Sequence, residues 1–190
     1  MPLPRRFYLR SARALARDLL GCLVVSRRGR ARTAGRIVET EAYLGPEDAA
    51  SHAAFRPGSH ALIYGDGGFA YVYLNYGIHY CLNAVAGPAG RPGCVLIRAL
   101  EPVAGLEMMA RRRGIGSDST RLASGPGNLT RALGVTLRDN GADLTRGLFT
   151  IEPPDRPRDF RTGVGPRVGI TRAVERRLRF WIAGSLFVSR

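Results

Sequence analysis

The chain has 190 residues, 45% of them hydrophobic, and its 29 Lys and Arg against 15 Asp and Glu give a net charge of +14. This length supports one sizeable core and leaves too little chain for two, so we expect a single domain over residues 1–190. The charge exceeds what solubility requires and indicates a polyanion such as nucleic acid as the partner.

Composition also excludes membrane and disulfide-scaffold classes. No apolar run approaches the roughly 18–20 residues of a membrane span, and the N-terminus lacks the apolar core of a signal peptide. We therefore expect a protein inside the cell, in the cytoplasm or nucleoid, with no membrane partner. We also expect it to be a monomer and to come from a bacterium. Cys22, Cys81 and Cys94 lie in apolar runs without metal-ligand spacing, which predicts reduced buried thiols, no metal and no cofactor.

All basic residues are arginines, since the sequence contains no lysine. The planar guanidinium is always charged and binds phosphate oxygens bidentately. A Schiff base on a lysine side chain is therefore impossible. A genome poor in A and T would produce the same absence, so the arginines alone do not establish phosphate binding.

In the first half of the chain, periodicity predicts a helix, two strands and an aromatic hairpin, over residues 11–20, 22–26, 36–43 and 71–85. Ser11 is placed to cap the helix. The basic loop over residues 27–30 is either a phosphate contact or a plain solvated turn. Gly77 divides the aromatic run and marks the hairpin turn.

In the second half, we expect strands over residues 93–100, 148–151, 167–170 and 178–188. A helix is predicted over residues 103–113, because it would follow Pro102 and end in three arginines that suit the helix dipole. A second, short helix is predicted to start near Ser124. The start of this helix is either a phosphate site, formed by its free N–H groups, or a routine loop-to-helix junction.

Two carboxylates share one face of the strand over residues 36–43. Strand alternation places Glu39 and Glu41 on the same face as Ile37 and Tyr43. Their backbones lie roughly 7 Å apart, within the range in which a carboxylate can activate water for attack at an anomeric carbon. The spacing is equally compatible with two exposed carboxylates that form ion pairs with nearby arginines, and this alternative remains open.

The aromatic hairpin places Tyr76 at or beside an exposed tip. A bulky ring on a protruding turn of a very basic protein suits a wedge that enters the base stack and fills the space of an extruded nucleotide. Without the charge, the same four tyrosines would indicate a core-packing hairpin. His52 taken alone is compatible with an ordinary loop histidine.

Together these segments resemble the alkyladenine, or 3-methyladenine, DNA glycosylase family of mammals and many bacteria. The resemblance rests on four ordered motifs: RIVETEAYLGPED (36–48) with His52, YVYLNYG (71–77) with CLN (81–83), CVLIRALEP (94–102) and SGP (124–126). It continues through RVG (167–169) and LRF (178–180) to Gly184 and Ser185, and so spans nearly the whole chain.

The resemblance assigns the chemistry to a small set of residues. It implies that Glu41 is the general base that positions and deprotonates water, and that Arg98 helps to hold this water. Glu39 is then structural. Tyr76 corresponds to the residue that intercalates through the minor groove.

The resemblance also implies a pocket for the flipped purine. Tyr43 and His52 would line one side and Tyr73 the other, so that the base is stacked between them. Backbone groups around Ala50 and His52 would read its edge. Asn83 matches the position that crowds the 2-amino group of guanine and so disfavours normal guanine.

The implied fold is a single α/β domain with a curved, mainly antiparallel sheet, flanking helices and a protruding hairpin. The implied protein is a monofunctional DNA glycosylase that excises 3-methyladenine, hypoxanthine or ethenoadenine from double-stranded DNA. One departure is the segment between His52 and Tyr71, where RPGSH (56–60) replaces a longer polar stretch. Two alternatives remain open: a non-catalytic nucleic-acid-binding protein of the same fold, and a hydrolase of carbohydrates or free nucleosides.

Overall fold

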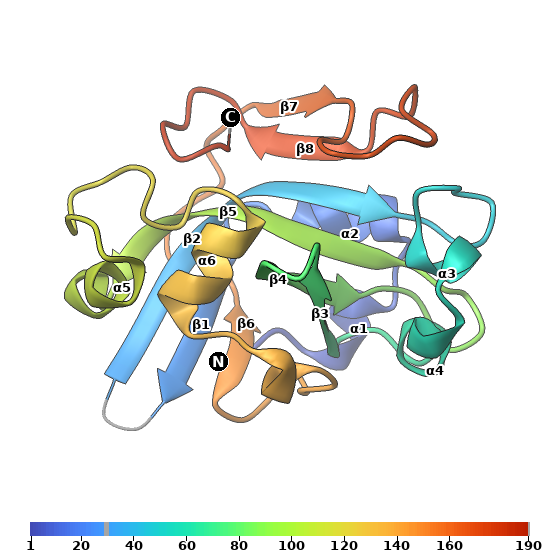
Figure 1. Cartoon of the computed structure of the whole chain (residues 1–190), viewed down its shortest axis with the longest axis horizontal. Helices are drawn as coiled ribbons and strands as arrows, with labels where there is room; N and C mark the ends of the chain where they lie inside the picture. The colour runs from blue at the N-terminus through green and yellow to red at the C-terminus, as the bar shows by residue number, and fades with distance from the viewer. Residues whose placement is uncertain (29–30, 190) are drawn as a thin grey trace.

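An eight-stranded sheet organises the part of the chain that the computed structural model describes, residues 1–28 and 31–189 (Figure 1). Its strands are β1 Leu23–Arg28, β2 Ala31–Tyr43, β3 Ala70–Asn75, β4 His79–Val85, β5 Cys94–Ala104, β6 Phe149–Glu152, β7 Thr162–Gly165 and β8 Arg179–Ile182. The helices are α1 Arg5–Tyr8, α2 Ala12–Asp18, α3 His52–Phe55, α4 His60–Ile63, α5 Leu106–Arg113 and α6 Pro126–Leu133, with 3₁₀ turns η1 Pro57–Ser59 and η2 Leu137–Asp139.

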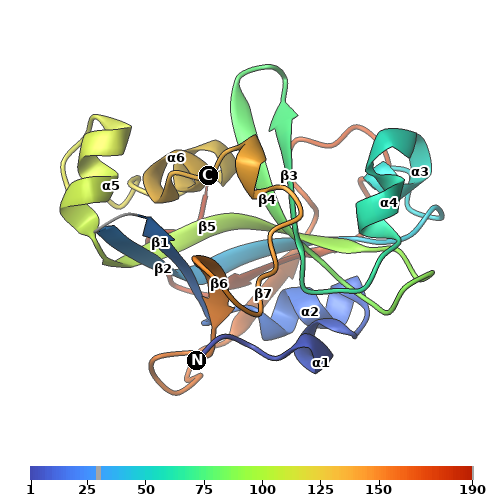
Figure 2. The same cartoon turned by 90° about the horizontal axis from the view of Figure 1, so that it is seen from below.

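Every strand pairing described in the sheet is antiparallel, and helices lie on both of its faces. The strand order is β3-β4-β5-β2-β1-β6, with β8 paired to both β2 and β7. Helices α1 and α2 lie on one face, whereas α6 and the β3–β4 hairpin rise from the other (Figure 2). The expected curved antiparallel α/β fold is therefore confirmed.

Strand β2 is central to this sheet because it pairs with three other described strands. One edge pairs with β5. The other pairs first with β1, up to Arg36, and then with β8 from Glu39 to Glu41. The β2–β5 register shifts between Ile37 and Thr40, as a β-bulge does. The change of partner brings β8, from the far end of the chain, beside the two carboxylates.

The hydrophobic core fills both faces of the sheet. Leu15 and Leu19 of the α2 region pack against one face, and Leu129 and Leu133 of α6 pack into the same buried cluster. Helix α2 begins as predicted, because the Ser11 side chain accepts a hydrogen bond from the Ala14 N–H. The three cysteines are unpaired and buried, as expected.

Two predicted elements are wrong in extent. The helix expected over residues 103–113 begins only at Leu106, because β5 continues through Pro102 to Ala104. Gly105 separates the two elements, and its φ of 72° is a conformation that favours glycine. Pro102 fits the strand because it lies opposite Gly35 at a register shift. The strand expected over residues 178–188 ends at Ile182.

A third prediction, a strand over residues 167–170, is wrong in place. These residues form an irregular segment, and the strand in this region is β7, which precedes them. The polar groups of the segment bind carboxylates: Arg167 contacts Asp48, and the Val168 N–H contacts Glu41. A residue whose N–H serves a side chain cannot also serve a strand ladder.

In the predicted basic loop, residues 29–30 lie outside the described part of the chain. Arg27 and Arg28 precede them at the end of β1 and form ion pairs with Glu152 and Asp139 respectively. These two arginines are therefore engaged within the protein. Among the described residues, no helix is long and apolar enough to cross a membrane.

The β3–β4 hairpin protrudes from the sheet and ends in a strained tip (Figure 2). Tyr76 and Gly77 have φ angles of 50° and 69°, and the Ile78 N–H donates to the Asn75 carbonyl at 3.0 Å. Positive φ at both central residues is the signature of a type I′ turn. Glycine tolerates this conformation, whereas a tyrosine there is uncommon and carries a conformational cost.

We expect Tyr76→Asn to raise the free energy of unfolding by about 0.5–1 kcal/mol, because asparagine adopts positive φ more readily than tyrosine. The Tyr76 side chain is 78% exposed, so its removal sacrifices little packing. Urea unfolding at neutral pH measures the change. Ile78→Asn is the matched control, since Ile78 is equally exposed at 80% but has no positive φ. An equal effect of both substitutions would contradict strain at Tyr76.

Candidate active site

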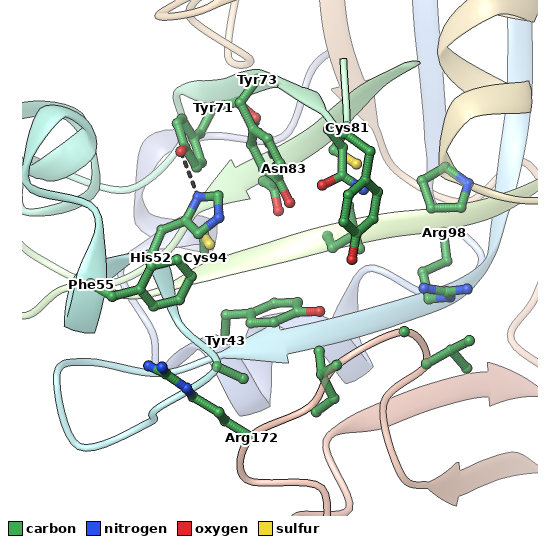
Figure 3. A pocket seen from close by; sticks show the side chains of 18 of the residues that line it. Tyr43, His52, Phe55, Tyr71, Tyr73, Cys81, Asn83, Cys94, Arg98 and Arg172 are labelled. Atoms are coloured by element: carbon green, nitrogen blue, oxygen red, sulfur yellow. Dashed lines mark hydrogen bonds between the residues drawn. The ribbon is translucent and has the colours of Figure 1, made fainter. Parts of the chain in front are cut away.

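A cavity of about 610 Å³ opens between β2, the β3–β4 hairpin, α3 and the segment that follows β7 (Figure 3). Its volume lies within the range of pockets that enclose small organic ligands. The side chains that line it include seven of the residues predicted from the sequence: Tyr43, Ala50, His52, Tyr73, Tyr76, Asn83 and Arg98. The structure therefore brings together residues that are up to 55 positions apart in the chain, from Tyr43 to Arg98.

The eighth predicted residue, Glu41, lies behind the cavity wall. It is fully buried, and both of its carboxylate oxygens are occupied. Oε1 accepts from the Val168 N–H at 2.7 Å and lies 3.3 Å from Arg98 Nη1. Oε2 accepts from the Tyr43 hydroxyl at 2.9 Å. All three partners line the cavity, so Glu41 is connected to the cavity by its contacts with these residues.

The environment of Glu41 raises the pKa of its carboxyl above the ordinary value. Burial is the main cause, and the negative charge of Glu39 adds to it. The Arg98 charge and the hydrogen bonds from Val168 and Tyr43 oppose the rise without cancelling it. A carboxylate with a raised pKa is a better proton acceptor near neutral pH, which suits a general base.

Glu39 is fully buried as well, and it accepts three hydrogen bonds. They come from Arg98 Nε at 3.0 Å, Arg179 Nε at 2.6 Å and the Ser189 N–H at 2.7 Å. None of these donors is near Glu39 in sequence. Arg98 thus contacts both carboxylates, with one guanidinium nitrogen on each.

Aromatic rings form much of the cavity wall. The His52 and Tyr73 rings are 4.5 Å apart between centroids, and Tyr71 lies 5.2 Å from Tyr73. We expected His52 and Tyr73 on opposite sides of a bound base, but their rings are in contact, too close for a base to lie between them, and join α3 to the hairpin in one aromatic wall. Tyr43 enters the cavity from β2 (Figure 3).

His52 is held in a fixed orientation and is neutral at physiological pH. Its Nδ1 lies 2.7 Å from the Tyr71 hydroxyl. Burial lowers the pKa of His52 to about 4, and the nearby Arg56 charge contributes. The ring therefore offers the cavity an uncharged aromatic surface around neutral pH.

A buried ion pair supports the Tyr43 wall, although sequence reasoning assigned no role to it. Arg167 donates to both carboxylate oxygens of Asp48, at 2.6 and 2.8 Å, and both side chains are fully buried. The Arg167 guanidinium also lies 4.7 Å from the Tyr43 ring centroid, in cation–π contact. Burial alone would raise the pKa of Asp48, but the Arg167 and backbone hydrogen bonds lower it. Both residues belong to motifs already noted, RIVETEAYLGPED and RVG.

Other lining residues were also missed from the sequence. Phe55, 51% exposed, contributes from α3 and contacts the His52 ring edge-to-face at 5.2 Å. Arg56, the next residue, lies 5.2 Å over the Tyr73 ring. Phe55 and Arg56 lie in the segment after His52 that is shorter than in the family, so no family motif could be matched to them. Arg172, on the segment after β7, also lines the cavity (Figure 3).

Asn83 and Ala50 are fixed by hydrogen bonds within the cavity wall. The buried Asn83 side chain donates to the Tyr71 carbonyl at 3.0 Å, across the two strands of the hairpin. The Ala50 N–H donates to Asp48 at 3.3 Å. Among the described residues, no group of three or more His, Cys, Asp or Glu side chains could hold a metal ion.

A second feature beside the cavity is a cluster of arginines on α5 and α6. Arg112, Arg113 and Arg131 line a groove of about 780 Å³ that also borders Ile78 and His79 of the hairpin. Partial burial and neighbouring arginines lower the pKa of Arg112 and of Arg113. Gathered like charges next to a protruding hairpin suit a polyanionic ligand.

An aromatic cavity backed by a buried carboxylate and bordered by arginines suits an enzyme that acts on a base of a nucleic acid, and comparison with known proteins identifies the class as DNA glycosylase. Residues 6–186 match the family model described as Methylpurine-DNA glycosylase (MPG), and the chain belongs to that family. DNA is accordingly its partner.

Individual relatives are similar over nearly their whole length. A protein from Koribacter versatilis is 48% identical over 198 residues, which cover 99% of this chain and 93% of the relative. One from Methanoculleus marisnigri is 46% identical over 193 residues and covers 100% of both chains. One from Bacillus licheniformis is 42% identical over 194 residues, with 100% and 97% covered. All three carry the provisional name 3-methyladenine DNA glycosylase.

Removing one partner of the buried Asp48–Arg167 pair leaves an uncompensated charge. We expect Asp48→Asn to lower the free energy of unfolding by about 3–5 kcal/mol. Denaturant unfolding at neutral pH measures this loss. Asp155→Asn is the matched control, because Asp155 also pairs with an arginine, Arg36, but its side chain is 39% exposed and Arg36 retains Glu101. The control is expected to lose less than about 1 kcal/mol, and an equally small loss for Asp48→Asn would refute the structural role of the pair.

Proposed function

We propose that this protein flips a damaged purine nucleotide out of double-stranded DNA into the aromatic cavity and hydrolyses the bond between base and sugar. The observation that carries the proposal is the fully buried Glu41, bonded only to groups that line that cavity or lie beside it. A carboxylate costs much to bury. A general base next to a ligand cavity explains why this cost is tolerated.

In the proposed reaction, Glu41 takes a proton from a water molecule while the water oxygen attacks the sugar C1′. Arg98 contacts both Glu41 and the cavity, which suits a residue that holds the water. The bond from C1′ to the base nitrogen breaks, and its electrons leave with the base. The negative carboxylate also stabilises the oxocarbenium-like sugar that forms on the way. The products are a free base and an abasic site.

The aromatic wall and the neutral His52 support a purine as the substrate base. Stacking on Tyr43 and on the His52–Tyr73 wall would hold it. Cationic bases such as 3-methyladenine are good leaving groups, whereas hypoxanthine and ethenoadenine need protonation. Asn83, which donates a hydrogen bond to the Tyr71 carbonyl in the cavity wall, would crowd a 2-amino group and so disfavour guanine. Ala50 would read the base edge through its carbonyl, because its N–H already donates to Asp48.

Tyr76 is the proposed wedge, and its strain supports this role. An exposed tyrosine held at positive φ is retained where function needs it, not where folding prefers it. The arginines of α5 and α6 would neutralise phosphates beside the hairpin. Cavity, hairpin and arginines all come from one chain, so a monomer suffices.

The principal test is release of the base by wild type and by Glu41→Gln. Duplexes with one 3-methyladenine, hypoxanthine or ethenoadenine are incubated with each protein, and base release and alkali-revealed breaks are measured. We expect Glu41→Gln to slow release about 10²–10⁴-fold, because the amide cannot accept the water proton. DNA binding should be retained.

Glu175→Gln is the control, since its carboxylate is 72% exposed and lies outside the cavity. It should leave the rate unchanged. No release from any duplex by wild type, together with binding that weakens steeply with salt, would instead support a non-catalytic nucleic-acid-binding protein.

The Tyr76→Asn variant tests the wedge independently of the chemistry. A smaller, polar tip cannot fill the gap left by an extruded nucleotide, so release from duplex DNA should fall although the protein becomes more stable. Release from a flexible single strand should be affected less. Equal rates of wild type and variant on duplex DNA would rule out the wedge.

We further expect a monofunctional enzyme, because the chain has no lysine side chain to attack the abasic sugar. With the N-terminal amine blocked, borohydride should trap no covalent complex with DNA, and strands should break only after alkali. Trapping by the blocked protein would overturn this expectation. An unblocked sample serves as the control for reaction at the N-terminus.

A further inference from the structure

We infer that Arg179 and Ser189 are positioning residues which, through Glu39, hold the Arg98 guanidinium in place beside Glu41. The inference rests on the proposed role of Glu41 as the base. It concerns residues of β8 and of the C-terminal segment, which do not line the cavity. Neither residue lines the proposed substrate site, so any effect on catalysis passes through the cluster of Glu39, Arg98 and Glu41.

The first step is the geometry of Arg98. Its Nε donates to Glu39 at 3.0 Å, and its Nη2 donates to the Ser189 hydroxyl at 3.2 Å. These two bonds fix the guanidinium plane. The remaining nitrogen, Nη1, then lies 3.3 Å from Glu41. Because the guanidinium is rigid and planar, fixing two of its nitrogens determines the direction of the third.

The second step is that Glu39 is itself fixed by groups from the end of the chain. Arg179 Nε donates to it at 2.6 Å, and the Ser189 N–H donates at 2.7 Å. Arg179 Nη2 also donates to the Ser189 carbonyl at 3.2 Å, which ties the two donors together. The Arg179 guanidinium lies 5.0 Å from the Trp181 ring centroid, so its own position is supported within β8.

The third step is charge. Two buried carboxylates, Glu39 and Glu41, face two guanidinium groups, Arg98 and Arg179, so the cluster is neutral when both carboxylates are ionised. Without Arg179, the two carboxylates would share the single charge of Arg98. Glu39 would draw Arg98 more strongly, and Glu41 would lose part of the interaction that favours its ionised form.

The consequence is a measurable shift in the pH dependence of catalysis. The base acts only as a carboxylate, so the rate falls as pH drops through the pKa of Glu41. Losing a compensating positive charge raises that pKa further, so the acid limb moves to higher pH. The charged and titratable groups that face Glu41 come from five elements or segments: Glu39 and Tyr43 on β2, Cys81 on β4, Arg98 on β5, Arg179 directly opposite on β8, and Arg167 after β7.

The experiment measures single-turnover release against pH for the lesion that wild type excises fastest. For Arg179→Met, we expect the acid limb to move up by about one pH unit. At any pH on the acid limb, below the wild-type midpoint, the rate at saturating enzyme should fall about tenfold, with little change in DNA affinity. Arg179→Lys should recover part of the shift, because it restores the charge but not both hydrogen bonds. Ser189→Ala should produce a smaller shift in the same direction.

Arg161→Met is the matched control, since Arg161 is exposed at the start of the same β7–β8 ribbon. It should leave the limb unchanged. The limb is compared only over the pH range in which circular dichroism shows each variant to be folded, and within that range a merely destabilised variant would leave it in place. An unmoved limb in Arg179→Met, with wild-type release that still requires Glu41, would overturn the positioning role alone. Wild-type release that does not require Glu41 would instead overturn the proposed function.

Discussion

Two carboxylates two residues apart on β2, Glu39 and Glu41, are both fully buried, and this burial dictates how the later segments of the chain must pack. Each ionised group costs several kcal/mol to remove from water unless it is paired and hydrogen-bonded. Glu39 and Glu41 obtain their partners from β5, from the segment after β7, from β8 and from Ser189. The last third of the chain must therefore fold back across β2, and the site is complete only when it has done so.

The same constraint links stability with recognition. The Asp48–Arg167 pair fixes the turn that leads into α3, and its guanidinium packs against Tyr43. Tyr43 in turn donates to Glu41. The aromatic wall and the carboxylate are thus held by one connected set of charged and polar groups. Such a network leaves the cavity little freedom to collapse, which suits the proposed role of binding a flat base without rearrangement.

The β3–β4 hairpin, in contrast, carries features at its tip that cost stability. Its strands are well paired up to Asn75 and His79, yet its tip presents exposed apolar side chains and a tyrosine at positive φ. Nothing in folding requires these features. Local strain and exposed hydrophobic surface are retained most often where a surface acts on a partner. The protein therefore combines a rigid, internally compensated cavity with a costly protruding element beside it.

Local patterns were enough to predict the helix after Ser11, the hairpin about Gly77, the two carboxylates on one strand and the positive charge carried by arginines alone. Family motifs added the residues that line the cavity. Which segments meet these residues became visible only in the folded chain. The donors to Glu39 lie 59, 140 and 150 positions away, and Arg167 lies 119 positions from Asp48.

No period of two or 3.6 residues encodes such contacts, because they depend on which strand pairs with each edge of β2. For the same reason, the strand expected over residues 167–170 proved to be an irregular segment whose polar groups serve carboxylates instead of a neighbouring strand. Local periodicity thus identified the carboxylates, whereas the long-range pairing of β2 with β5 and β8 supplied the charges that allow them to be buried.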